Sequence, residues 1–175
     1  MAGPTIGGTS AKPAASTRED APRLVIPIFE NKTFEPNLEQ KLTTYARHEF
    51  SAGSGVRVVP GAEAADLRLK ATIVSVLTPS LSFTQSATFE TRVTVTVKAV
   101  VEDLRSGKEV WNQNSTASSE FFITNDLQFN RVLQARALEQ AGRLIAEDLA
   151  TRFLAHLEAK AQAKDAAPAE KKSAQ

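Results

Sequence analysis

The sequence contains no cysteine, which excludes disulfide bonds, thiolate nucleophiles and cysteine-based zinc sites together. It leaves the cellular compartment open, because many proteins of oxidising compartments also lack cysteine. Histidine is nearly as scarce, with His48 and His156 as the two candidate imidazole bases. Each falls in a predicted helix beside charged neighbours, which favours a solvated surface histidine over a catalytic one.

The remaining chemistry-bearing residues form no recognisable catalytic pattern. The carboxylates Glu63 and Asp66 flank two alanines, and Glu147 and Asp148 point to different sides of a predicted helix, so neither pair converges as acid–base chemistry requires. The G-S-G at 53–55 lacks the longer glycine loop and following lysine of a phosphate-binding motif and is interpreted as a helix terminator. We therefore expect no catalytic residues, no metal site and no cofactor.

The sequence also lacks an excess of either charge and any long apolar run. Its 21 Lys and Arg residues balance 20 Asp and Glu residues, which gives no general reason to expect nucleic acid as a partner. No stretch of about 20 apolar residues is present, so no membrane-spanning helix is predicted. The first residues have neither the basic nor the apolar region of a secretion signal, which we interpret as a mature or trimmed chain.

Composition divides the chain into three parts. Residues 1–22 are rich in Gly, Pro, Ser, Thr and Ala, and we expect them to form a flexible leader because they cannot bury enough apolar surface to stay folded. Residues 23–157 carry the periodic patterns of one folded domain. Residues 158–175 have no apolar stripe, which predicts a helix extension that fades into a disordered tail.

The clearest pattern is a long strand predicted over 87–101, with apolar residues at most odd positions and polar residues at even ones. A two-residue period is typical of a sheet with one buried and one wet face. A partner strand is predicted over 109–121, joined to the first by a hairpin turn around Ser106 and Gly107. The sheet therefore has a long polar surface that is free to meet a partner.

Further elements flank this hairpin. Strands are predicted at 23–29, with Pro27 indicating an edge or bulge, and at 67–77, and a short extra strand at 56–59. One helix is expected to open at Pro36, follow the stripe Leu38, Leu42, Tyr45, Ala46 and Phe50, and end at Gly53. A final helix, capped by Asn125 or Asp126, has the predicted apolar stripe Val132, Leu138, Ala141, Ile145, Leu149 and Phe153.

These elements define a fold class. The order is β-α-β-β-β-α with one optional short strand, and both helices need an apolar surface to cover. We predict an α+β two-layer sandwich: a mixed, mostly antiparallel four-stranded sheet with two helices on one face.

Several blocks, in their order and spacing, resemble the LptE family of lipopolysaccharide-assembly lipoproteins from Gram-negative outer membranes. The blocks are F-E-N-K-T-F-E-P-N-L at 29–38, A-D-L-R-L-K-A-T-I at 65–73, E-T-R-V-T-V-T-V-K-A-V-V-E-D at 90–103 and S-G-K-E-V-W at 106–111, followed by a long terminal helix. The resemblance extends over essentially all of 23–157.

The resemblance implies a non-catalytic protein that sits inside the β-barrel of LptD, helps to assemble it and delivers lipopolysaccharide to the outer leaflet. LptE proteins are held at the periplasmic side of the outer membrane by a lipid on an N-terminal cysteine, which this chain lacks. We hypothesise that Met1 stands where that cysteine would be and that residues 1–22 tether the domain to the lipid anchor. The resemblance also implies that the protein is a monomer in a one-to-one complex.

Arg and Lys on rigid strands suit the anionic phosphates of lipopolysaccharide. The candidates on the wet face are Arg92 and Lys98, with Arg68 and Lys70 on the preceding strand. The alternative is that they are solvated strand charges balanced by Glu90 and Glu102. The apolar tips at 79–83 and 121–123 could either fold into the core or touch barrel or acyl chains.

Two other functions remain open on the residues alone. The same α/β unit could belong to a periplasmic outer-membrane lipoprotein that scaffolds or activates a cell-wall synthase. A small enzyme of unrecognised type would require a deep pocket holding His48 or a carboxylate pair with perturbed titration.

Overall fold

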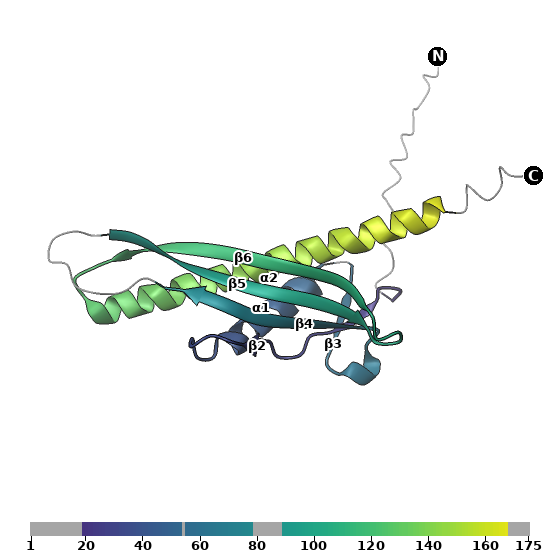
Figure 1. Ribbon diagram of the computed structural model, residues 1–175, viewed down its shortest axis with the longest axis horizontal. Coiled ribbons are helices and arrows are strands. Elements are labelled where there is room, and N and C mark those ends of the chain that lie inside the picture. Colours follow the sequence, from purple (N-terminus) through teal and green to yellow (C-terminus); the bar gives the residue numbers. More distant parts are fainter. Residues whose placement is uncertain (1–18, 54, 79–88, 168–175) are drawn as a thin grey trace, which may run out of the picture.

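Three long antiparallel strands form the body of the sheet. The computed structural model describes residues 19–53, 55–78 and 89–167, and within them β4 (Leu67–Leu77) pairs with β5 (Phe89–Asp103), which pairs with β6 (Glu109–Ile123). The alternation along β5 buries Val93, Val95 and Val97 completely and leaves Arg92 and Lys98 exposed. The predicted half-wet hairpin is therefore confirmed (Figure 1).

Three short strands extend the sheet at the other side of β4. They are β1 (Arg23–Val25), β2 (Glu30–Asn31) and β3 (Arg57–Val59). The order is β3-β1-β4-β5-β6, with β2 also pairing with β4, and the short strands pair in parallel. The mixed α+β class is confirmed and the optional short strand at 56–59 is present as β3, but the described residues form a sheet of six strands where four, or five with that optional strand, were predicted.

Part of the difference arises at Pro27. The strand predicted over 23–29 is split, because β1 ends at Val25 and β2 begins only at Glu30. Pro27 is exposed in the gap between them, where its missing N–H removes no ladder hydrogen bond. One predicted strand thus supplies two short strands that both lie against β4.

Helix α1 (Leu38–Ala52) begins two residues later than predicted. Asn37, its N-cap, has a φ of 62°, a left-handed conformation that asparagine tolerates and that interrupts the helix after Pro36. The predicted apolar stripe is otherwise correct, with Leu38, Leu42, Ala46 and Phe50 buried, and the helix ends before Gly53 as expected.

Helix α2 (Leu127–Ala166) begins at one of the two predicted caps. The Asp126 carboxylate accepts hydrogen bonds from the backbone N–H groups of Gln128 and Phe129, at 2.9 and 3.1 Å. The helix continues to Ala166, and residues 168–175 lie outside the described part of the chain. None of the helices formed by the described residues combines the length and apolar character needed to cross a bilayer.

The predicted α2 stripe contains one error. Leu138, Ala141, Ile145, Leu149 and Phe153 are buried, whereas Val132 is 46% exposed. At about 100° per residue, Val132 lies about 120° around the helix from Leu138, so it belongs to the outer side.

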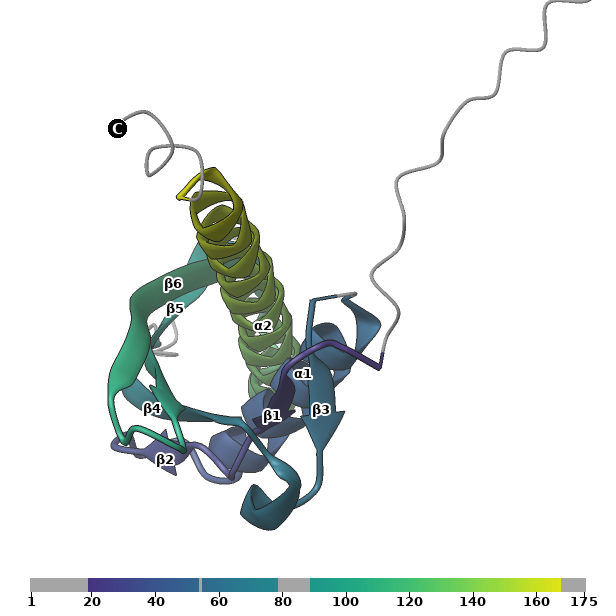
Figure 2. The ribbon, with the colours of Figure 1, turned by 90° about the vertical axis from the view of Figure 1, so that its right-hand side faces the viewer.

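The core lies between the curved sheet and both helices, which cover the same face (Figure 2). At its centre the Phe153 ring packs against Phe50 and Trp111, with ring centroids 6.0 and 5.2 Å apart. Two polar contacts fix the helices to the strands: Thr43 accepts a hydrogen bond from the buried N–H of Phe29, and Ser115 on β6 donates to Asp148 on α2. No helix formed by residues 19–53, 55–78 or 89–167 covers the opposite face of the long strands.

Candidate interface on the polar face of the sheet

The outward side chains of β4, β5 and β6 make a continuous polar surface, which we call the polar face. Its centre is a row of hydrogen-bonded hydroxyl pairs. The hydroxyl oxygens of Thr94 and Ser118 lie 2.8 Å apart, and those of Thr96 and Thr116 lie 3.1 Å apart. Each pair lies directly opposite in the β5–β6 register. Such pairs support the sheet and leave spare hydrogen-bonding capacity on every hydroxyl oxygen.

Two of the four predicted basic residues form ion pairs on this face. Arg92 lies 3.3 Å from Glu120 on β6, and Lys70 lies 2.9 Å from Glu102 on β5. The predicted balancing by Glu102 is thus correct, whereas the partner of Arg92 is Glu120 and not Glu90. Both pairs are largely exposed, so each contributes at most about 1 kcal/mol and leaves its cation accessible.

The other two basic residues, Lys98 and Arg68, make no ion pair with the described residues. Lys98 is exposed at the middle of β5, opposite Thr72 and Asn114. Arg68 is half-buried near the hairpin turn. Glu102 lies opposite it in the register but pairs with Lys70 instead. Of the four candidates, Lys98 and Arg68 are therefore the two whose positive charge is not paired with a carboxylate of a described residue.

The four candidates share a face but do not form one cluster. Arg68 and Lys70 lie near the β5–β6 turn, Lys98 lies near the middle and Arg92 near the far end. At about 3.3 Å per residue, Arg92 is roughly 20 Å along β5 from Lys98. The arrangement can contact an extended anionic surface at separate points, whereas a single small anion could not touch all four.

Exposed apolar side chains near the rims are features that alternation alone did not single out. Leu77 is 65% exposed and Val74 is 48% exposed, next to a register shift between Ile73 and Ser75. In the predicted apolar tip, Phe121 is buried while Phe122 is 56% exposed. The other predicted tip, 79–83, lies outside the described residues.

Phe34 stands out within the block at 29–38 because its side chain is fully exposed. Asn31 organises this turn: its Oδ1 accepts from the backbone N–H of Thr33 at 2.9 Å, and its Nδ2 donates to Glu39 and to the Glu35 carbonyl at 2.8 Å. Asn31 thus has a structural role in the block at 29–38, whereas the side chain of Phe34 points to solvent.

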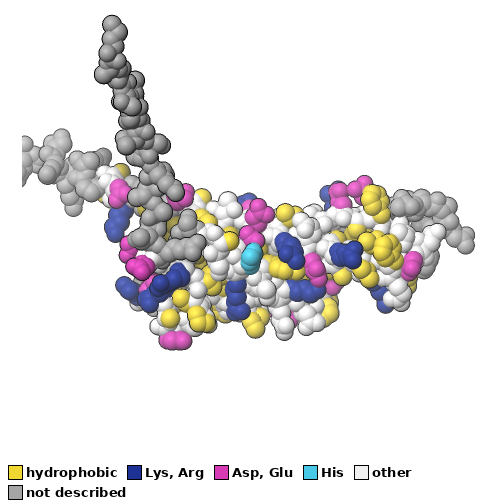
Figure 3. Space-filling model, turned by 180° about the vertical axis from the view of Figure 1, so that it is seen from behind, with side chains coloured by type: hydrophobic (Ala, Val, Ile, Leu, Met, Phe, Trp, Pro, Cys, Tyr) yellow, Lys and Arg dark blue, Asp and Glu magenta, His cyan; other side chains and the backbone are white. Residues whose placement is uncertain are grey.

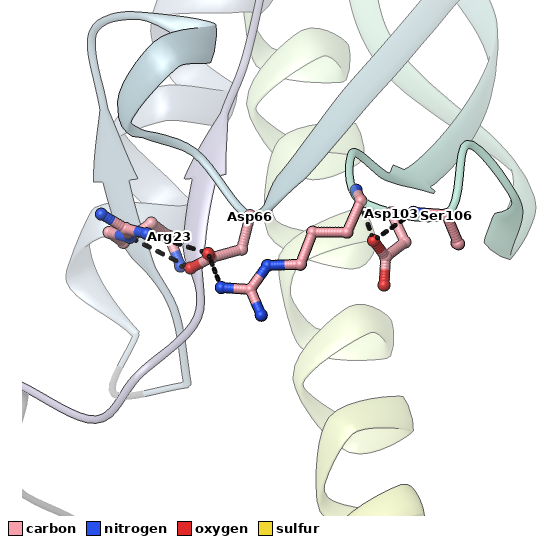
Figure 4. Close-up of polar contacts among 5 residues, drawn as sticks. Arg23, Asp66, Asp103 and Ser106 are labelled. Carbon is pink, nitrogen blue, oxygen red and sulfur yellow. Dashed lines mark hydrogen bonds and ion pairs between the residues drawn. The ribbon is translucent and has the colours of Figure 1, made fainter.

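At the turn end of the polar face, Asp66 joins three elements (Figure 4). Its carboxylate accepts from Nη2 and Nε of Arg23 at 2.9 and 3.1 Å, and Arg105 in the hairpin turn lies 3.5 Å away. These hydrogen bonds from Arg23 lower the pKa of Asp66 to about 2. In the turn itself, Asp103 accepts from the backbone N–H groups of Arg105 and Ser106.

The histidines are placed on the helices as predicted. His48 is exposed on α1, beside a hollow where the Arg143 guanidinium lies 4.5 Å from the centre of the Tyr45 ring. His156 stacks on Phe153, with ring centroids 6.3 Å apart. The described residues contain no group of three or more His, Cys, Asp or Glu side chains able to hold a metal ion.

Solved structures share this fold at low sequence identity. The protein CT253 from Chlamydia trachomatis has a TM-score of 0.57 and 8% identity, covering 78% of this chain and 98% of its own. XCC0632 from Xanthomonas campestris has a TM-score of 0.57 and 12% identity, and the match covers 81% of this chain and 89% of XCC0632. A chain of the PelC dodecamer from Paraburkholderia phytofirmans has a TM-score of 0.52 and 14% identity, and the match covers 85% of this chain and 91% of the PelC chain. At these identities the likeness establishes the fold alone.

No curated protein matches the sequence. The sequence model of the LptE family, described as lipopolysaccharide-assembly, matches residues 21–157. The match includes the turn organised by Asn31, all six strands, α1 and most of α2. The chain therefore belongs to the LptE family of lipopolysaccharide-assembly lipoproteins of the outer membrane.

Proposed function

We propose that this protein is a non-catalytic plug that occupies the lumen of an LptD-type β-barrel, supports the assembly of that barrel and helps deliver lipopolysaccharide to the outer leaflet. The observation that carries the proposal is the polar face, a long surface of hydroxyl, amide and charged side chains on a family member. The lumen of a large outer-membrane barrel is polar, so a plug needs such a surface more than an apolar one.

The rigidity of the sheet supports this role. The residues that display the polar face alternate with Val93, Val95 and Val97, which are completely buried under the helices. The backbone of such a strand loses little further freedom when its side chains make contacts, so binding does not have to order a loop. Each strand therefore presents its polar groups to the barrel in a fixed register.

For lipopolysaccharide, we assign Lys98 and Arg68 as the principal contacts and Arg92 and Lys70 as secondary ones. Lys98 and Arg68 have no ion pair with the described residues, so an incoming phosphate replaces none of those residues as a partner. Arg92 and Lys70 would have to exchange Glu120 and Glu102 for the ligand. The separation of the cations along β5 suits the spread of phosphate and sugar groups on one large ligand.

The family also motivates an N-terminal lipid in the native protein, in the place where this sequence has Met1. A lipid chain contributes about 0.8 kcal/mol per buried CH₂, which would hold the domain at the periplasmic side of the outer membrane. Metabolic labelling of the protein expressed from its full reading frame with an alkyne fatty acid tests this point. Labelling that depends on a cysteine preceding Ala2 supports the anchor, and an unlabelled, membrane-free protein contradicts it.

Site-specific photocrosslinking tests the plug directly. A benzoylphenylalanine residue at Thr96 or Thr116, in the centre of the polar face, should crosslink to the barrel in intact cells. The same residue at Leu144, exposed on the helix layer, serves as the matched control for a surface on the other side. Crosslinks from Leu144 but none from Thr96 or Thr116 would show that another surface faces the barrel.

The lipopolysaccharide contacts need a separate test. The double variant Arg68→Ala, Lys98→Ala, which removes both principal contacts, should bind purified lipopolysaccharide about tenfold more weakly, since it loses two charge-assisted contacts. Arg131→Ala, Lys160→Ala removes two exposed cations from α2 and should bind like the wild type. Equal binding by both double variants would remove the assigned contacts and leave the plug intact.

The cell-wall scaffold is the alternative outcome of the same work. Recovery of a synthase in place of a barrel protein, from cells that carry the tagged protein, would favour it.

A further inference from the structure

The outer edge of β6 is open beside α2. β6 is the last strand of the sheet that the described residues form, and within that sheet it pairs only with β5. Among the described residues, no backbone hydrogen bond reaches 118–122 from the side away from β5. In an antiparallel pair, every second residue points its N–H and C=O away from the partner strand. This stretch therefore presents unpaired backbone groups to any chain that lies along it.

A groove of about 570 Å³ runs along this open edge. The groove is lined by the consecutive β6 residues 119–122. Because neighbouring side chains of a strand point to opposite faces of the sheet, a groove that touches all four must lie at the edge of the strand. Helix α2 forms the other wall and contributes Phe129, Leu133 and Arg136. A groove between an edge strand and a helix is the geometry in which a peptide can be added as an extra strand.

The walls of the groove combine apolar surface with one positive charge. Phe121 is buried at its base, and the exposed Phe122 and Phe129 stand at its sides, 56% and 48% exposed. Figure 3 shows hydrophobic side chains together with basic and acidic ones at the end of the molecule where α2 begins. This combination fits a ligand that is apolar at one position and charged at another.

The charges of the groove indicate the sign of that ligand. Glu120 already pairs with Arg92 across the polar face, at 3.3 Å. Arg136 is exposed and makes no ion pair with the described residues. Its neighbour Glu139 on α2 attracts it but is already paired with Lys41 at 2.7 Å, so the balance of charge at the groove is positive, which favours an acidic side chain in the occupant.

We infer that this groove binds an extended, acidic polypeptide segment of a partner protein by strand addition to β6. The segment would pair its backbone with residues 118–122, place an apolar side chain between Phe122 and Phe129, and direct a carboxylate to Arg136. The groove adjoins the polar face and shares Glu120 with it, but strand addition uses the outer edge of β6, so the inference does not depend on which barrel or enzyme the protein assembles with.

The probe is a synthetic hexapeptide of alternating Val and Thr with one Thr replaced by Asp, titrated into isotopically labelled protein. Strand addition predicts that alternate amides within 118–122 gain protection from hydrogen exchange. The amides between them should change little, because they already donate to β5. Shifts confined to side chains of Phe129 and Leu133, with no alternating protection, would overturn the inference.

Charge reversal supplies the matched comparison. Arg136→Glu should weaken binding of the Asp peptide by about tenfold and favour the same peptide with Lys in place of Asp. Arg131→Glu makes the same change on the same helix outside the groove and should leave binding unchanged. Decanoate tests an aliphatic ligand: if it fills the groove while the peptide protects no amide, the occupant is an acyl chain and the inference is wrong.

Discussion

Replacing Asp66 by Asn tests whether the ion pairs at the turn end of the sheet stabilise the fold. Asp66 connects Arg23 on β1 with Arg105 in the β5–β6 turn, and its backbone N–H also donates to the carbonyl of Arg23. Asparagine keeps the size of the side chain and removes the charge. The substitution therefore isolates the electrostatic part of this connection.

The size of the effect follows from the pKa of Asp66, which Arg23 lowers from 3.8 to about 2. A lowering of this size corresponds to roughly 2.5 kcal/mol if it is fully expressed in stability. The side chains of Asp66 and Arg23 remain 28% and 39% exposed, so solvent screens the pair. We expect Asp66→Asn to lower the free energy of unfolding by about 1–2 kcal/mol at pH 7.

The pH dependence has a definite sign. Because the folded-state pKa of Asp66 lies below its unfolded value, the carboxylate contributes its full stabilisation above about pH 4. That contribution is lost as the pH falls through about 2, when the folded protein also binds the proton. The wild type and the Asn variant should therefore converge in stability at the acid end.

Urea unfolding followed by the fluorescence of Trp111, the one tryptophan of the chain, measures this at pH 7, 4 and 2.5. Trp111 is 92% buried, since its exposed fraction is 8%, and should respond to loss of the core. Glu63→Gln, at an exposed carboxylate between β3 and β4, is the control. Equal stability of the Asn variant and wild type at pH 7, or a difference at pH 2.5 as large as the one at pH 7, would refute the reasoning.

Two further substitutions test the core and the attachment of α1, each against a matched control. Phe153→Leu should cost about 1–2 kcal/mol because it removes ring contacts with Phe50 and Trp111, whereas Phe129→Leu, at an exposed ring, should stay within about 0.5 kcal/mol of the wild type. Thr43→Val should cost about 1–3 kcal/mol because the buried N–H of Phe29 loses its acceptor, whereas Thr44→Val changes an exposed residue and should be nearly neutral. Both are measured by urea unfolding; equal losses in variant and control would contradict the assignment.

The long elements could be predicted from the sequence because each carries a strong, uninterrupted period. The strand at 67–77 coincides with β4, and the hairpin and both helices are present. The short strands were harder because β1 and β2 contain too few residues to show a period. Pro27 marked a break without indicating that the chain resumes pairing at Glu30.

The polar face could be predicted as a surface, but its internal partners could not. Alternation places Arg92 and Lys98 on the same face, as the structure does. Which carboxylate meets Arg92 depends on the register of β5 against β6, and that register places Glu120 opposite it. The groove at Arg136 was not predicted because it lies between β6 and α2. The apolar period of each element shows which side faces the core, but it does not show how the edge of the strand lies against the helix.

Purification of the tagged protein with its partners from outer membranes tests the central proposal most directly. The account predicts that an LptD-type barrel is recovered in a one-to-one complex that survives detergent extraction and is identified by intact-mass measurement. Recovery of the protein without a barrel, or with a cell-wall synthase in its place, would contradict it.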